Sequence, residues 1–224
     1  MNLFHTSLLS LALLLASVAA HAQPVNWANT QSDHKHILTA HAGIEHAIVF
    51  GAGYNRKVNA GKFPLLVGGD YSFASGKTIF DDSKLKIGAQ IGLLNWKALH
   101  VSARLHGIAR TTKNDFVRMT GFGSEAALTA GIYKPKWFTG AEFGFDKSIV
   151  IHLKHGQAYK DNYAAAVDGW YEPDAGGNVY FGLVAGRTFG RHDITVRAGR
   201  MLTEQFKAMH ALPLYFELGY NLKF

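Results

Sequence analysis

The sequence predicts an all-β protein, an antiparallel up-and-down transmembrane β-barrel of about eight to ten strands. Three observations support this fold class. Apolar residues alternate with polar or small ones in segments of about ten residues, an apolar leader precedes them, and short and long connections alternate along the chain. A period of two is typical of strands, whereas helices give a period of 3.6.

Residues 1–22 have the features of a secretory signal peptide. An apolar run from Leu8 to Ala20 leads into Ala20-His21-Ala22, and cleavage after this A-x-A site frees Gln23. The region before the run is atypical because it contains no Lys or Arg. The run is too short for a transmembrane helix, which needs roughly 20 apolar residues. We therefore expect an exported chain without a spanning helix, with a flexible segment over 23–36 and the barrel over 37–224.

The composition fits one domain and narrows the chemistry. The 224 residues include 23 Lys and Arg against 16 Asp and Glu, but no run of three basic residues. We interpret this as a dispersed basic excess rather than a surface for phosphate-bearing partners. Cysteine is absent, so disulfides and thiolate chemistry are excluded. No P-loop, dinucleotide fingerprint, zinc-ligand spacing or nucleic-acid module occurs, and we expect no cofactor and no nucleic-acid partner.

Eight segments alternate clearly, and a ninth stretch is too long for one strand. The eight are residues 63–73, 85–94, 99–109, 122–133, 137–153, 179–189, 194–202 and 214–224. The stretch 37–58 is about twice the roughly 9–11 residues that a tilted strand needs to span a bilayer. It is either one long strand or two strands that fold back. Bacterial barrels have even strand counts, so ten strands are favoured over eight strands plus an irregular N-terminal segment.

Each segment has one apolar face and one polar face. The apolar faces include Ile87, Leu105, Leu128, Phe143, Ile149 and Ile151. A soluble sandwich would turn these residues inward. Export without a spanning helix instead favours a closed barrel with its apolar face toward lipid, because such a barrel pairs every backbone group.

The aromatic residues and the connections support the same orientation. Aromatic residues gather where segments end, as expected for interfacial girdles: Tyr54, Phe63, Phe73, Phe80, Trp96, Tyr133, Trp137, Phe138, Phe189, Tyr220 and Phe224. Short connections at 59–62, 95–98, 134–137 and 190–193 alternate with long ones at 74–82, 110–121, 155–178 and 205–213. Outer-membrane barrels alternate short periplasmic turns with long external loops in this way.

The last strand carries the resemblance to a known family. It closes in YNLKF, with Tyr220, Leu222 and Phe224 on its apolar face, and resembles the C-terminal motif of bacterial outer-membrane β-barrel proteins. The chain from Ile37 onward is similar in pattern to the small barrels of the OmpA, OmpX and OmpW kind, and most similar to uncharacterised outer-membrane barrels of the Bacteroidota. The resemblance implies a Gram-negative outer-membrane location and recognition by the barrel-assembly machinery. It further implies contact with outer-membrane lipid and lipopolysaccharide, and a monomer.

The polar faces place many ionisable residues in the lumen. The candidate lumen network consists of Asp70, Lys86, His100, Arg104, His106, Glu125, Glu142, Asp146, Arg197 and Glu217. Buried charges are tolerated only when they are paired and hydrogen-bonded. The sequence therefore predicts either a salt-bridged plug, which we favour, or a narrow polar pore.

A catalytic alternative rests on one strand. Ser102 lies between His100 and His106 on the same face, and Asp70 or Glu125 could complete a nucleophile–base–acid set. Outer-membrane families that cleave acyl chains place their site on the lipid-facing surface, whereas these residues face inward. No family motif accompanies them, and we assign no catalytic residue.

Two further features are open to functional and non-functional readings. His34 and His36 could bind a metal weakly, but they precede the first strand and are better explained as a solvated tail, so we expect no metal site. The connection 155–178 carries Tyr159, Tyr163, Trp170 and Tyr171 among charged residues. Such a loop could contact sugars or proteins, or fold over the barrel mouth as a lid.

The function we expect is therefore non-enzymatic. The protein would serve a structural, surface-contact or adhesion role through its external loops. A narrow channel for ions or small polar solutes is the alternative, and a lipid-modifying hydrolase or acyltransferase is the third possibility.

Overall fold

The computed structural model describes residues 24–30, 34–45, 47–61, 63–76, 78, 80–163, 166–173, 176–203 and 213–224. The predicted signal peptide, residues 1–22, lies outside the described residues, and so does Gln23, the predicted first residue of the mature chain. Within the described part, no helix is long and apolar enough to cross a membrane.

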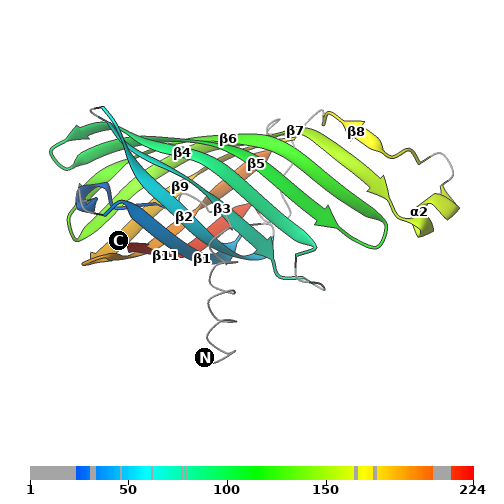
Figure 1. Ribbon diagram of the computed structural model, residues 1–224, viewed down its shortest axis with the longest axis horizontal. Coiled ribbons are helices and arrows are strands. Elements are labelled where there is room, and N and C mark those ends of the chain that lie inside the picture. Colours follow the sequence, from blue (N-terminus) through cyan, green and yellow to red (C-terminus); the bar gives the residue numbers. More distant parts are fainter. Residues whose placement is uncertain are drawn as a thin grey trace, which may run out of the picture.

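Ten long antiparallel strands form a closed barrel (Figure 1). They are β1 (His36–Ile44), β2 (Ile48–Ala60), β3 (Phe63–Ala74), β4 (Asp82–Trp96), β5 (Leu99–Lys113), β6 (Val117–Lys134), β7 (Trp137–His155), β9 (Gly177–Phe189), β10 (His192–Thr203) and β11 (Leu214–Lys223). Each strand pairs with its neighbours in the chain, and β1 pairs with β11 to close the cylinder. The predicted up-and-down barrel of eight to ten strands is confirmed.

The count of ten depends on the turn between β1 and β2. Ile44 pairs with Ile48, so the stretch 37–58 folds back on itself instead of running on as one strand. The remaining elements are a 3-10 turn η1 (Trp27–Asn29), a short helix α2 (Gln157–Asn162) and a three-residue strand β8 (Gly169–Tyr171), which pairs with β7.

The two ends of the barrel differ. At the turn end, connections such as Gly190–Arg191 join adjacent strands directly, and Gly61 and Gly190 there have positive φ angles of 64° and 61°. Glycine adopts this left-handed conformation without steric cost. At the loop end, β5, β6 and β7 extend beyond the other strands and carry α2 and β8 (Figure 1).

The prediction of a long loop over 110–121 is wrong. β5 continues to Lys113 and β6 begins at Val117, so only three residues connect them. The Asn114 side chain accepts hydrogen bonds from the backbone N–H groups of Phe116 (2.9 Å) and Val117 (2.8 Å), which fixes this tight turn. The apolar alternation stops before the ladder does, because the outer positions of the protruding strands are polar, among them the directly paired Thr111 and Thr120.

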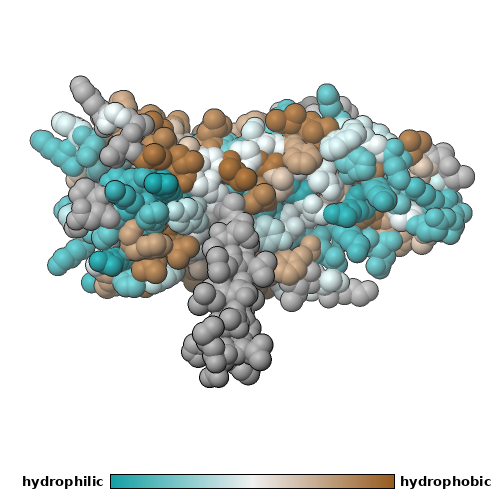
Figure 2. Space-filling view, in the orientation of Figure 1, coloured by the Kyte–Doolittle hydropathy of each residue, from teal (hydrophilic) through white to brown (hydrophobic). Residues whose placement is uncertain are grey.

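The outer wall of the barrel is apolar. Ile87, Leu105, Leu128 and Phe143 are 55%, 64%, 51% and 55% exposed, although they lie in the middle of regular strands. Figure 2 shows hydrophobic side chains across the central part of the molecule and hydrophilic side chains toward both ends. A closed sheet with an apolar outside and a charged inside is the arrangement of membrane-spanning barrels.

One residue predicted to face outward faces inward. A β-bulge shifts the register between Phe122 and Gly123, so that Ile149 is an extra residue in β7. Beyond it, Ile151 pairs with Gly121, which pairs in turn with Arg110 on the inner face. Directly paired residues share a face, so the bulge reverses the alternation and turns Ile151 inward.

Two of the predicted girdle aromatics also point inward. Tyr133 and Phe138 are 3% and 1% exposed, and their rings stack at 5.0 Å with an interplanar angle of 6°. They belong to an apolar cluster inside the turn end, together with Val25, Trp27, Ile37, Leu66 and Val184. Trp96 and Trp137 remain on the outer wall, 62% and 41% exposed.

Part of the segment predicted to be flexible, residues 24–30, packs inside the barrel. Residues 24–30, including η1, lie inside the turn end, where Val25 and Asn26 are 1% and 0% exposed. The reason is chemical: Val25 and Trp27 join the apolar cluster, while Asn26 and Asn29 hydrogen-bond to the barrel wall.

Candidate functional site

The lumen is the candidate site, and nearly every strand contributes to it. Nine of the ten predicted lumen residues are buried there, and the tenth, Asp146, is partly buried. β3 supplies Asp70, β4 Lys86, β5 His100, Arg104 and His106, β6 Glu125, β7 Glu142 and Asp146, β10 Arg197 and β11 Glu217.

Eight side chains form a continuous charged chain across the lumen. In order they are Asp70, His41, Glu217, Arg197, Glu142, Arg104, Glu125 and Lys86, each within 4 Å of the next. We call this set the charge chain. It alternates acidic and basic groups, and it draws on eight of the ten barrel strands.

The centre of the charge chain is the contact between Arg197 and Glu142. The guanidinium donates to both oxygens of this carboxylate, at 2.9 Å and 3.0 Å. It also donates to Glu217 at 3.2 Å. Arg104 continues the chain from Glu142, with an N–O separation of 3.7 Å, to Glu125 at 3.1 Å. Two arginines and three glutamates therefore fill the cross-section of the barrel.

His41 lies between two carboxylates. Its two ring nitrogens lie 2.8 Å from Asp70 and 3.2 Å from Glu217. A neutral imidazole has only one N–H, so both contacts are hydrogen bonds only when the ring is protonated. With His41 as an imidazolium, the charge chain contains four carboxylates and four cations.

Tyr180 and Tyr215 are part of the same network, and the sequence analysis missed them. The Tyr180 hydroxyl accepts from Arg104 at 2.9 Å and donates to Glu125, and Tyr215 donates to Glu142 at 2.9 Å. Both occupy inward positions of β9 and β11, so the alternation could have identified them. Gly144 of β7 leaves the space that the Tyr180 ring occupies, because a Cβ at Gly144 would overlap that ring.

Further ion pairs lie above the charge chain, toward the loop end. Lys84 donates to Glu45 at 2.6 Å, and Arg110 donates to both oxygens of Asp82 at 3.0 Å and 2.7 Å. Asn178 donates to Asp146 at 2.7 Å. Burial raises the pKa of the Glu45 carboxyl, but the ammonium groups of Lys84 and Lys86 outweigh it and hold that pKa at about 2.

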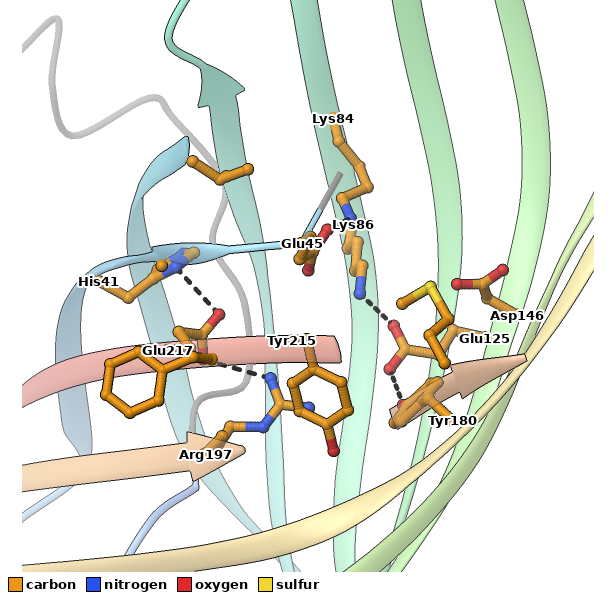
Figure 3. Close-up of a pocket in the computed structure, with 14 residues that line it drawn as sticks. His41, Glu45, Lys84, Lys86, Glu125, Asp146, Tyr180, Arg197, Tyr215 and Glu217 are labelled. Atoms are coloured by element: carbon orange, nitrogen blue, oxygen red, sulfur yellow. Dashed lines mark hydrogen bonds and ion pairs between the residues drawn. The ribbon is translucent and has the colours of Figure 1, made fainter. Parts of the chain in front are cut away.

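A small cavity lies where Glu45, Lys84 and Asp146 face the charge-chain residues His41, Lys86, Glu125, Arg197 and Glu217 (Figure 3). In the figure, His41, Glu217 and Arg197 point toward one another, and Lys86 and Tyr180 approach Glu125. The cavity has a volume of about 40 Å³, which is room for about three water molecules. It is too small for a sugar or a nucleotide.

The turn end is closed by residues 24–30. Asn26 donates to the Lys134 carbonyl at 2.9 Å and to the Thr188 hydroxyl at 2.8 Å. Asn221 donates to the Pro24 carbonyl at 3.0 Å, and Lys223 donates to Asn29 at 3.1 Å while pairing with Asp193 at 2.9 Å. The lumen is thus filled at two levels, by the charge chain and by the N-terminal segment.

The candidate nucleophile Ser102 lacks a base. Its hydroxyl accepts from Gln90 at 3.4 Å. His100 instead packs its ring 5.2 Å from Tyr133, and His106 faces Glu125 at 3.8 Å. Neither imidazole hydrogen-bonds to Ser102, so the strand spacing does not produce a nucleophile–base pair. Among the described residues, no group of three His, Asp or Glu side chains could hold a metal ion.

The connection 155–178 is divided into two parts. At its base, Asp168 accepts from Lys160 at 2.7 Å and from the backbone and ring of His155 at 2.8 Å and 3.0 Å. These hydrogen bonds hold the pKa of the Asp168 carboxyl well below its usual range. On the α2 side, the Tyr159 ring stacks on His155 at 5.0 Å and contacts the tilted ring of Tyr163 at 4.8 Å.

The other two loop aromatics lie on β8, beside the barrel wall. Trp170 contacts His152 at 4.9 Å and Phe122 at 6.1 Å, and it remains 60% exposed. Tyr171 donates its hydroxyl to the Val167 carbonyl at 2.8 Å. The four aromatics therefore do not form one contact surface.

The three residues of the predicted assembly signal lie on the outer wall, Tyr220 and Leu222 in β11 and Phe224 next to its last residue. Tyr220 is 41% exposed and its hydroxyl lies 2.6 Å from the His192 ring. Phe224 is 45% exposed and stacks on His36 at 5.4 Å, and Leu222 is partly exposed. Their strand is the one that closes the barrel against β1.

Comparisons with known proteins return only distant structural similarity. No family model and no curated protein matches the chain. Among solved structures, the beta domain of the Bordetella autotransporter Brka is 12% identical, covers 86% of this chain and 100% of its own, and has a TM-score of 0.42. Pseudomonas aeruginosa OprD is 12% identical, with coverages of 82% and 63% and a TM-score of 0.16. Acinetobacter baumannii OccAB2 is 7% identical, with coverages of 88% and 99% and a TM-score of 0.20.

Proposed function

We propose that the protein is a non-enzymatic barrel of the bacterial outer membrane with a closed lumen. Its role is structural, or one of surface contact or adhesion through the connections at the loop end. In the outer membrane, the turn end would face the periplasm and the protruding strands β5, β6 and β7 would face the exterior. The barrel-assembly machinery would insert the exported chain.

The observation that carries the proposal is the charge chain. Its arginines and glutamates meet across the lumen, with Arg197 and Glu142 joined by two hydrogen bonds of 2.9 Å and 3.0 Å. A conducting pore of this width needs the same groups to line an open wall around a water column. Here they neutralise one another, which favours a plugged barrel over the narrow channel.

Conductance in planar bilayers tests the proposal directly. Purified mature protein should give no single-channel current across a range of voltages. A double variant, Arg104→Ala with Arg197→Ala, in a chain that also lacks residues 24–30, removes both obstructions. It should conduct, which shows that the assay would detect an open lumen.

Discrete current steps from the unaltered protein would contradict the closed lumen and support the narrow channel for ions or small solutes. A folded double variant that stays silent would mean that other side chains close the lumen, and the charge chain would lose its assigned role.

A further inference from the structure

Three basic residues lie side by side on the outer face of the protruding strands. Lys113 of β5 pairs with Arg118 of β6, and Arg118 pairs with Lys154 of β7. Directly opposed residues project from the same face of a sheet. Their neighbours Thr112 and Met119 lie on the inner face, since Thr112 donates to Asp82 and Met119 lines the inner mouth. The three side chains, which we call the cation row, therefore point outward.

The cation row has no acidic partner within the described part of the chain. All three residues are exposed, and no hydrogen bond or ion pair involves their side chains there. This differs from the inner face of the same strands, where Arg110 is paired with Asp82. Like charges directly opposite one another destabilise a sheet, so the row is unfavourable unless something anionic neutralises it.

An apolar and aromatic surface lies next to the cation row on the same wall. On β6, Phe122 follows Arg118 and lies nearer the middle of the barrel, and its ring centroid is 6.1 Å from that of Trp170. Phe122 and Ile149 are 45% and 57% exposed. Arg118 is four residues beyond Phe122, which is about 13 Å along the strand. Aromatic residues gather at the boundary between the acyl region and the headgroups of a bilayer, so the cation row, which is farther toward the loop end, lies on the headgroup side of Phe122 and Trp170.

We propose that the cation row binds the phosphate groups of an anionic lipid in the outer leaflet, with that lipid's acyl chains against Phe122 and Ile149. Arginine and lysine together suit a phosphate, because the guanidinium forms paired hydrogen bonds and the ammonium adds charge. The continuity of the row with a lipid-facing wall favours a lipid over a soluble polyanion. The inference rests on the proposed outer-membrane location.

The test uses the full mature protein in detergent micelles and lipid A as the probe. Binding of diphosphorylated lipid A, dephosphorylated lipid A and inorganic phosphate is measured by native mass spectrometry. The variant Lys113→Gln, Arg118→Gln, Lys154→Gln removes the row. The control Lys97→Gln, Lys134→Gln, Lys136→Gln removes three exposed positive charges from the turn end.

The unaltered protein and the control should bind diphosphorylated lipid A equally. Basic residues near an anionic lipid surface each contribute measurably, so losing three should weaken binding on the order of 100-fold. Dephosphorylated lipid A and inorganic phosphate should bind weakly to all three proteins, and raising the salt concentration should weaken the specific binding.

Equal binding by the row variant and the control would overturn the inference. Equal binding of the two forms of lipid A would show apolar contact alone, and tight binding of inorganic phosphate would point to a soluble anion. None of these results depends on lumen conductance. Evidence against lipid binding by the cation row is therefore distinguishable from evidence against the closed lumen.

Discussion

Arg197 contacts two carboxylates in a part of the lumen that holds almost no free space. It donates to Glu142 and to Glu217, and the whole residue is 9% exposed. Removing one partner of a buried ion pair leaves the other charge without compensation, which costs far more than the pair contributes in net terms.

Arg197→Gln should therefore lower the free energy of unfolding by about 3–5 kcal/mol. Urea unfolding of the folded protein in lipid vesicles, followed by tryptophan fluorescence, measures the change. Lys160→Gln is the control, because its pair with Asp168 is substantially exposed, with side chains 37% and 31% accessible. An exposed pair contributes about 1 kcal/mol or less, so equal effects of the two substitutions would contradict the charge chain's structural role.

Gly144 shows the same tight packing at a position where the lumen has no room for a larger side chain. A Cβ added there would meet three atoms of the Tyr180 side chain, and these are its three nearest neighbours. Overpacking a tight interior typically costs about 1–3 kcal/mol.

We expect Gly144→Ala to destabilise the barrel in the presence of Tyr180 and to have little effect in a Tyr180→Leu background. A double-mutant cycle on unfolding free energies measures this coupling. Additive effects of the two substitutions would mean that the glycine serves something other than the tyrosine ring.

The sequence predicted which residues face the lumen, but it did not predict which of them contact one another. Alternation assigned Glu142 and Arg197 to the inner face, yet they come from β7 and β10. Which inward groups meet depends on strand stagger and on the width of the closed barrel, and neither property is written in the local pattern.

At the scale of elements, the N-terminal segment departs most from expectation. Residues 24–30 hold apolar and amide side chains in no periodic pattern. Inside the barrel they hydrogen-bond to groups of several strands, among them the Lys134 carbonyl and the Thr188 hydroxyl.

Asn26→Ala should loosen this segment without unfolding the barrel. The substitution leaves buried hydrogen-bonding groups unpaired, at a cost of about 1–3 kcal/mol. Hydrogen exchange of residues 24–30 should accelerate, while exchange in β1 to β11 stays slow. Asn162→Ala, in the exposed helix α2, is the matched control and should change neither region. Unchanged exchange in the Asn26 variant would mean that the apolar contacts of Val25 and Trp27 hold the segment alone.

The lengths of β5, β6 and β7 were also underestimated, for a physical reason. A strand inside the bilayer needs one apolar face, so it shows a period of two. Beyond the acyl region the outer face no longer needs to be apolar, and residues such as Thr111 and Thr120 pair in the ladder without that signal.

At the scale of the whole molecule, the absence of cysteine allows its orientation to be tested. We expect Asn162→Cys, in α2 at the loop end, to react with a membrane-impermeant maleimide on intact cells. Lys136→Cys, at the turn end, should react only after the outer membrane is permeabilised. Labelling of both sites on intact cells, or of neither, would contradict the proposed location, and the reverse pattern would invert the orientation.

The sequence by itself determined that the chain forms an antiparallel barrel with an apolar wall and an ionic interior. Alternation is a local property that can be recognised in each segment. Eight clear segments, one stretch of double length and the even strand counts of bacterial barrels together favoured ten strands. Only the tertiary structure decided which side chains meet across the lumen, that residues 24–30 fill the turn end, and that a bulge turns Ile151 inward. These features follow from the closure of the sheet, which brings strands distant in sequence to the same few ångströms, and no pattern along one strand can encode that.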